Sequence, residues 1–470
     1  MQGESMSTKF NNRYILSISL VSALGGFLFG YDWVVIGGAK FFYERYFELT
    51  QIPHLQGIAM SSALLGCIPG AMFAGYFSDR FGRRRSLIFA AVLFFFSALG
   101  TGFSDHFTMF MLFRILGGLG VGMASVVSPI YIAEISPRQM RGRLVALNQL
   151  NIVLGILAAQ ITNYLIAKEV PAGATDVFIV NSWNGRMAWR WMFWAETIPA
   201  GIFFIFGFFI PESPRWLVRS GNSGLALNTL NRIGDDGYGA TILEEIKQSL
   251  KETSQKIDYK SLVSKKVRPV LVLGLALAFF QQWCGINIVF NYADEVFSSA
   301  GFGINATLLN IVATGVVNLV FTIVAIRTVD KWGRKKLMLL GAAGLAITYI
   351  ILGAAYYMEV SGTVVLAVIL VAIGLYGLTL APVTWVILSE IFPNRIRGAA
   401  MAVASTTLWI SSTLLVLLFP IIKSKIYIYG AFWLYAAICI IGFFYVKARL
   451  PETKGKSLEE IEALTSTEPK

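Results

Sequence analysis

Twelve apolar stretches, each long enough to cross a lipid bilayer, constrain this chain more than any other feature. A helix that crosses about 30 Å of hydrocarbon needs roughly 20 mainly apolar residues. Six stretches precede a long polar segment, residues 211–268, and six follow it. They lie near 14–37, 56–77, 86–104, 109–133, 144–166, 189–210, 269–297, 306–327, 337–357, 362–389, 398–421 and 427–448. The sequence therefore predicts an all-α membrane protein with twelve transmembrane helices in two groups of six.

The composition of the 470-residue chain agrees with this interpretation. Hydrophobic residues make up 56% of the chain and charged residues only 14%, whereas soluble globular proteins carry about 25% charged residues. The three cysteines lie inside apolar stretches without the spacing of a disulfide framework or a metal site. No nucleophile–base set and no phosphate-binding loop stands out. We therefore expect neither an enzyme nor a bound cofactor or metal.

Positive charges predict the orientation of the helices, because cytoplasmic loops of membrane proteins carry the excess of Lys and Arg. Most of them fall before the first stretch, in every second loop, in the central segment and in the tail. Both termini are therefore expected in the cytoplasm. Lys40 is counted among the few positive residues of the alternate loops, which are expected on the side away from the cytoplasm. The net charge of +12 then reflects orientation and contact with anionic membrane lipids, and does not indicate nucleic-acid binding.

The two groups of helices repeat three motifs in the same order. The pairs are Asp79-Arg80-Phe81-Gly82-Arg83-Arg84 with Asp330-Lys331-Trp332-Gly333-Arg334-Lys335, Glu134-Ile135-Ser136-Pro137 with Glu390-Ile391-Phe392-Pro393, and Pro211-Glu212-Ser213 with Pro451-Glu452-Thr453. This pattern indicates a duplicated six-helix unit, and parallel repeats place a substrate site between the halves at mid-membrane depth. We expect an N-terminal bundle over 1–210, a cytoplasmic linker with short helices over 211–268, a C-terminal bundle over 269–450 and a cytoplasmic tail over 451–470.

Acids and bases of these motifs could pair across the interface between the halves and hold one of two conformations. The alternative is that the arginines only anchor the orientation of the loops. The candidate gating residues are Asp79, Arg80, Arg83, Glu134, Arg141, Glu212, Arg215, Asp330, Arg334, Glu390 and Arg397.

Several further segments complete a recognisable pattern: Gly25-Gly26-Phe27-Leu28-Phe29-Gly30-Tyr31-Asp32, residues 114–122, Pro211-Glu212-Ser213-Pro214-Arg215, residues 281–287 and Pro451-Glu452-Thr453-Lys454-Gly455. With the paired loops, they make the chain resemble the sugar porter family of the major facilitator superfamily over nearly its whole length, with most likeness to bacterial xylose or pentose–proton symporters. The resemblance implies the major facilitator fold, alternating access and four short cytoplasmic helices in the central segment. Apolar residues between Ile242 and Leu250 do recur at helical spacing.

The implied function is proton-coupled uptake of a monosaccharide, a pentose such as xylose or arabinose or a hexose such as glucose. The implied location is the cytoplasmic (inner) membrane, where we expect a functional monomer that contacts lipids. An uncoupled sugar facilitator and a membrane sugar sensor remain alternatives.

The seventh stretch carries three amides, Gln281, Gln282 and Asn287. Amides both donate and accept hydrogen bonds, as the hydroxyls of a sugar require. Asn287 would lie on another face of a regular helix, so we expect a break at Gly285 to bring the three together. The alternative is hydrogen bonding between helices.

The resemblance assigns sugar contacts to Gln149, Gln281, Gln282, Asn287, Asn318 and Trp385. Trp409 is a second aromatic candidate, and Phe29 is a candidate for the opposite side of the pocket. Asn291, Ser412 and Ala381 depart from the family pattern. These departures alter the pocket size and a possible outer gate, so the particular sugar stays open.

Asp32 and Arg114 lie deep in the first and fourth stretches, where an unpaired charge is expensive, so we expect them to pair. Proton coupling needs a carboxyl group whose proton affinity changes between conformations. The resemblance agrees, since proton-coupled members have Asp here. Glu196, also deep in its stretch, is a candidate modulator. A purely structural ion pair is the alternative.

Overall fold

The computed structural model describes residues 10–252, 264, 267–392 and 396–454, and this part of the chain is helical and contains no strand. Ten helical segments are long and apolar enough to cross a membrane. The sixth apolar stretch is divided into two shorter helices by a turn at Ala195 and Glu196. The last two stretches run together as one helical segment, which is interrupted at Tyr427 by a non-helical backbone with φ 59° and ψ 175°.

The helices of the first half and of the central segment are α1 (Asn12–Tyr46), α2 (Pro53–Phe81), α3 (Arg83–Phe103), α4 (Phe107–Ile135), α5 (Arg141–Ile166), α6 (Asp176–Asn181), a π-helical turn (Asn184–Ala188), α7 (Trp189–Trp194), α8 (Thr197–Gly207), α9 (Pro214–Arg219), α10 (Ser223–Ile233) and α11 (Asp236–Glu252). Those of the second half are α12 (Arg268–Trp283), α13 (Ile286–Asn291), α14 (Ala293–Ser299), α15 (Ile304–Trp332), α16 (Arg334–Tyr357), α17 (Gly362–Leu378), α18 (Leu380–Ile391) and α19 (Arg397–Arg449).

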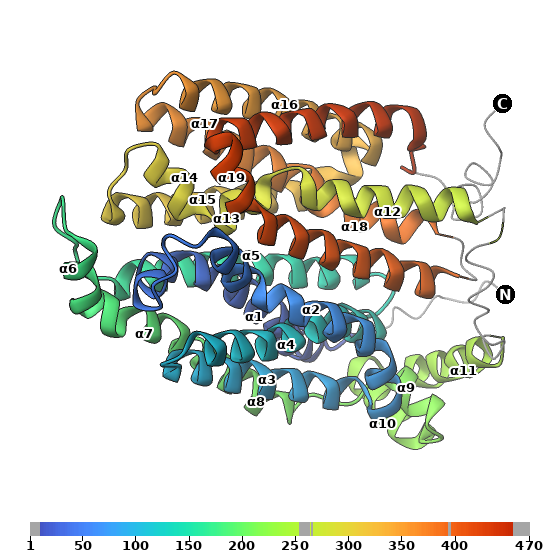
Figure 1. Ribbon diagram of the computed structural model, residues 1–470. Coiled ribbons are helices and arrows are strands. Elements are labelled where there is room, and N and C mark those ends of the chain that lie inside the picture. The colour runs from blue at the N-terminus through green and yellow to red at the C-terminus, as the bar shows by residue number, and fades with distance from the viewer. Residues whose placement is uncertain (1–9, 253–263, 265–266, 393–395, 455–470) are drawn as a thin grey trace.

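The helices form two bundles that lie side by side. Figure 1 shows α1–α8, coloured blue to green, in one bundle and α12–α19, coloured yellow to red, in the other. Within a bundle, small residues let backbones approach closely, as is common between membrane helices. A Cβ atom on Gly118 of α4 would lie only 1.8 Å from the carbonyl oxygen of Ala63 in α2. The tight packing of these two helices therefore depends on that glycine.

The central segment forms three short helices, α9–α11, at one end of the first bundle (Figure 1). Ser213 begins α9, because its hydroxyl accepts a hydrogen bond from the Trp216 N–H and Pro214 occupies the first turn. The stretch Ile242–Leu250 lies within α11, as its helical spacing predicts. Four helices were expected in this segment, and residues 253–263, 265 and 266 lie outside the described part of the chain.

The first helix runs from this end of the molecule to the opposite one. The backbone N–H of Asn11 donates to the Ile233 carbonyl of α10 at 2.9 Å, which ties the start of α1 to the central segment. The other end of α1, near Tyr46, therefore lies at the far end of the bundle. We call the end with α9–α11 the inner end and the opposite end the outer end.

Candidate functional site

The seventh apolar stretch is broken at Gly285, as the sequence predicts. Its backbone has φ 93°, in the left-handed region that favours glycine, between the end of α12 and the start of α13. A Cβ atom there would also meet the Tyr435 ring at 2.7 Å. Both the backbone conformation and the packing thus require glycine at this position.

The break brings the three amides into one hydrogen-bonded chain. Asn287 Nδ2 donates to Gln282 Oε1, and Gln282 Nε2 donates to Gln281 Oε1. Gln281 Nε2 then donates to the Tyr376 hydroxyl of α17 at 2.7 Å. All three amides are buried. Each keeps further donor or acceptor capacity, so the chain can exchange some of its internal bonds for bonds to sugar hydroxyls.

Aromatic rings from both halves meet near this chain. The Phe29 ring of α1 lies 5.5 Å from the Trp409 ring of α19. Trp33, one turn further along α1, contacts Phe29 at 6.5 Å and Phe290 of α13 at 5.9 Å between ring centroids. Phe29 and Trp409 therefore do face one another across the two halves. Trp33 and Tyr376 were not predicted from the sequence, although a tryptophan next to Asp32 was a usable signal.

The remaining sugar-contact candidates are Gln149, Asn318 and Trp385. Gln149 of α5 and Trp385 of α18 are half-buried, and Asn318 of α15 is buried. A Cβ atom on Gly377 of α17 would lie 3.2 Å from Asn318 Oδ1, so this amide faces α17. Among the described residues, no hydrogen bond or ring contact joins these three side chains to Gln281, Gln282 or Asn287.

Of the positions that depart from the family pattern, Asn291 lies in the broken helix. Asn291 Nδ2 donates to the Asn287 carbonyl at 2.8 Å, inside α13. The next residue, Tyr292, donates its hydroxyl to the Val416 carbonyl of α19 at 2.6 Å. Ser412 is buried, while Ala381 is half-buried at the start of α18. Asn291 therefore binds its own helix backbone.

Asp32 and Arg114 pair deep in the first bundle, as expected. Arg114 Nη1 donates to Asp32 Oδ1, and Arg114 Nη2 donates to the Asp32 carbonyl at 3.0 Å. Glu196, in the turn between α7 and α8, is 1% exposed, and its carboxyl lies against that of Asp32. Within the described part of the chain, no other group donates a hydrogen bond to Asp32 Oδ2 or to either Glu196 oxygen. Two carboxyls that face each other beside one guanidinium can share a single proton.

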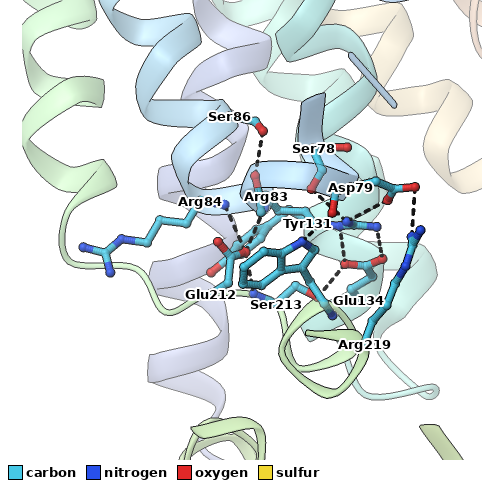
Figure 2. Close-up of polar contacts among 12 residues, drawn as sticks. Ser78, Asp79, Arg83, Arg84, Ser86, Tyr131, Glu134, Glu212, Ser213 and Arg219 are labelled. Carbon is cyan, nitrogen blue, oxygen red and sulfur yellow. Dashed lines mark hydrogen bonds and ion pairs between the residues drawn. The ribbon is translucent and has the colours of Figure 1, made fainter. Parts of the chain in front are cut away.

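The inner-end motifs of the first half form one connected network, shown in Figure 2. The Arg83 guanidinium binds Glu134 and Asp79, each at 3.0 Å. The Glu212 carboxylate accepts from the Arg83 N–H at 2.8 Å and the Arg84 N–H at 3.1 Å, which satisfies free N–H groups at the start of α3. Burial raises the pKa of Glu212, and these N–H bonds oppose the rise. Gly82, with φ 98°, makes the turn between α2 and α3.

The second half repeats the central bonds of this network. Glu452 accepts from the Arg334 N–H at 2.9 Å and the Lys335 N–H at 3.2 Å. Glu390 pairs with the Arg334 guanidinium at 3.1 Å and accepts from the Thr453 hydroxyl at 2.6 Å. Gly333 has φ 90°, close to the φ of the matching glycine. The duplication therefore extends from the motifs to their hydrogen bonds.

The pairing across the two halves that the motifs suggested is not what the structure shows. The inner-end ion pairs named above join residues of the same half, because each acid caps or binds the loop of its own bundle. Arg80, Arg141 and Arg215 are exposed. The side chains of Asp330 and Arg397 lie outside the described part of the structure.

Comparisons with known proteins agree with this geometry. The family described as "Sugar (and other) transporter" matches residues 18–464. The D-xylose-proton symporter of Escherichia coli (strain K12) is 40% identical, over 99% of this chain and 98% of the relative. The glucose transport protein of a Synechocystis strain is 39% identical, over 96% and 97%. A partially occluded inward-open structure of the E. coli xylose transporter superposes with a TM-score of 0.84 and 37% identity, over 95% of this chain and 100% of that one.

Proposed function

Because this chain belongs to the sugar transporter family, we propose that it takes up a monosaccharide together with a proton by alternating access. The buried amide chain at the break of the seventh stretch carries the proposal, since amides that donate and accept suit a ring of hydroxyls. The two relatives named above, a xylose–proton symporter and a glucose transporter, support a pentose or a hexose as substrate.

In this proposal the sugar binds between the halves. Its hydroxyls replace bonds within the amide chain of Gln281, Gln282 and Asn287, and an apolar face of its ring stacks on an aromatic side chain. The further contacts we assign are Gln149, Asn318, Trp385, Trp409 and Phe29. The half-burial of Gln149 and Trp385 supports their assignment, because a side chain that lines a cavity keeps some exposed surface.

The proton is proposed to bind at the pair of carboxyls beside Arg114. Asp32 stays ionised while Arg114 binds it, and becomes protonated when the guanidinium moves away in a low-dielectric surrounding. Glu196 modulates this change, because its buried carboxyl has no other partner and competes for the same proton.

For the architecture we propose twelve membrane-spanning helices with both termini in the cytoplasm. The turn between α7 and α8 and the kink at Tyr427 support this number, because they account for the difference from ten. The proposed parts are bundles over 1–210 and 269–450, a cytoplasmic linker over 211–268 and a cytoplasmic tail over 451–470. We propose the cytoplasmic membrane as location and a functional monomer in contact with lipids.

Transport by purified protein in lipid vesicles tests the function. Radiolabelled xylose, arabinose and glucose are offered with and without an inward proton gradient. Accumulation above the outside concentration only with the gradient supports symport. Equilibration without accumulation favours a facilitator, and absence of uptake of all three sugars refutes the proposed substrate class.

A further inference from the structure

At the outer end, a buried lysine joins the two halves. Lys40 of α1 is 1% exposed and binds Asp294 of α14 at 3.0 Å and also Glu295. Glu44, one turn further along α1, lies 3.5 Å from the Lys40 ammonium. Lys423 of α19 binds the other oxygen of Glu295 at 2.6 Å. We call these five residues the outer cluster.

The outer cluster contains one more acid than base. Three carboxyls face two ammonium groups, so the fully ionised cluster carries one net negative charge. Lys423 keeps a side-chain exposure of 32%, whereas Glu44 and Asp294 keep only 8% and 7%. A buried net charge without compensation is costly. Binding one proton removes it.

Two carboxylate oxygens show where this proton can bind. Both are buried: among the described residues Asp294 Oδ1 receives no hydrogen bond, and Glu44 Oε1 has only the Lys40 ammonium, at 3.5 Å. A protonated carboxyl gains one O–H donor, so it can satisfy an oxygen that an ionised pair leaves without a donor. The two oxygens belong to side chains that contact the same lysine, and their incomplete hydrogen bonding is an observation separate from the charge count.

The other polar groups around the outer cluster do not supply the missing proton. Gln56 Nε2 of α2 donates to Glu44 Oε2 at 3.2 Å and not to Oε1, whose contact is the Lys40 ammonium at 3.5 Å. The Tyr43 hydroxyl faces the Met60 sulfur and the Tyr292 hydroxyl donates to the Val416 carbonyl. Lys40 also lies 5.1 Å from the centre of the Tyr292 ring.

The outer cluster lies where the two halves are closed against each other. A Cβ atom on Gly37 of α1 would lie 3.2 Å from the Asn291 carbonyl of α13. Asn305 of α15 accepts from the Val170 N–H and donates to the Val170 carbonyl, both at 3.1 Å. Any outer opening of the site must therefore separate Lys40 from Asp294 and Glu295.

We propose that the outer cluster is a second proton site, which binds one proton from the outer side when the halves close over it. The step is the protonation of a carboxylate of Glu44 or Asp294 to a carboxylic acid, and opening returns the proton to the same side. This proton is therefore not transported, and it links closure of the outer gate to the outer pH. The proposal rests on the alternating access proposed above but not on sugar–proton symport.

Distances between spin labels at the outer end test this proposal. Labels at Gln51→Cys and Ser361→Cys, two exposed positions in different halves, report closed and open populations by double electron–electron resonance without sugar. The protein is measured in lipid nanodiscs from pH 5 to 9, a range of about four units. Asp32→Asn and Glu196→Gln are present throughout, so that the central carboxyls do not titrate.

We expect the ratio of closed to open molecules to fall as the pH rises. Where one linked proton titrates, the fall should be about tenfold per pH unit. Glu44→Gln or Asp294→Asn makes the cluster neutral without a proton, so the closed form should persist and its pH dependence should vanish. Having two such variants protects the test if one fails to fold. Lys40→Met should favour the open form at every pH, because it leaves three carboxyls with Lys423 as their one base.

Asp176→Asn is the matched control, since Asp176 is an outer-end carboxylate that pairs with Arg45 but has a side-chain exposure of 64%. It should leave the pH dependence unchanged. A closed-to-open ratio that does not depend on pH, or a dependence that persists in both Glu44→Gln and Asp294→Asn, overturns the proposal. Vesicles that fail to accumulate sugar would instead refute symport, with the label distances unaffected.

Discussion

Gln282→Ala is the most direct test of the amide chain, because the Gln282 side chain lies at its centre. It accepts from Asn287 and donates to Gln281. Truncation removes both bonds and leaves the Gln281 oxygen without that donor. Asn287 keeps a longer bond, 3.3 Å, to the Gln282 backbone carbonyl.

The expected losses of stability and of sugar affinity in Gln282→Ala follow from the number of hydrogen bonds removed. Each side-chain hydrogen bond contributes about 1 kcal/mol net, so the two internal bonds predict a loss of about 2 kcal/mol in the free energy of unfolding. One amide that bridges two sugar hydroxyls contributes a similar amount to binding. At about 1.4 kcal/mol per tenfold, we expect the dissociation constant for sugar to rise roughly 30-fold.

Isothermal titration calorimetry in detergent measures the binding, and thermal unfolding measures the stability. Asn291→Ala is the matched control, because Asn291 is a buried amide of the same broken helix that binds its own backbone. It should lower the unfolding temperature but change sugar affinity far less. Affinity within about threefold of wild type in Gln282→Ala, or an equal loss in both variants, would refute the assignment of this amide to the sugar.

Three further predictions concern other parts of the molecule. Trp385→Ala should weaken the affinity for all accepted sugars together, by about 1 kcal/mol or roughly fivefold in calorimetry; a change in maximal rate alone would indicate a packing role. Asp32→Asn should abolish accumulation of labelled sugar under a proton gradient but preserve exchange of labelled for unlabelled sugar, because a neutral amide cannot alternate between Arg114 and a proton; a mutant that still accumulates sugar would contradict this. Glu212→Ala and Glu452→Ala should each destabilise the protein by about 2 kcal/mol in thermal unfolding, since each carboxylate accepts from two N–H groups of the helix it caps; a large loss in one and none in the other would contradict the functional equivalence of the two networks.

Features that depend on local sequence were predictable. Apolar length indicated the membrane helices, and the break at Gly285 followed from three amides that a regular helix would place on different faces. The repeated motifs indicated the duplication, and Gly82 and Gly333 at matching places in them both have positive φ. In each case, the residues that cause the structure lie within a few positions of it.

Features that depend on distant partners were not predictable in the same way. Lys40 was counted as a loop residue because a charge near the end of an apolar stretch usually marks the membrane surface. Its partners Asp294 and Glu295 lie in the other half of the chain, so only the fold shows that all three are buried together. The motif ion pairs were expected between the halves because the motifs show which charges exist but not which acid reaches which loop.

The inner and outer ends of the molecule differ in the ion pairs that must break when the two halves separate. None of the inner-end ion pairs named here crosses from one half to the other, so separating the halves at that end breaks none of them. Separation at the outer end must pull Lys40 away from two carboxylates. The empty protein should therefore rest open at the inner end, and its return to the outer-open form should be the slow half of each cycle.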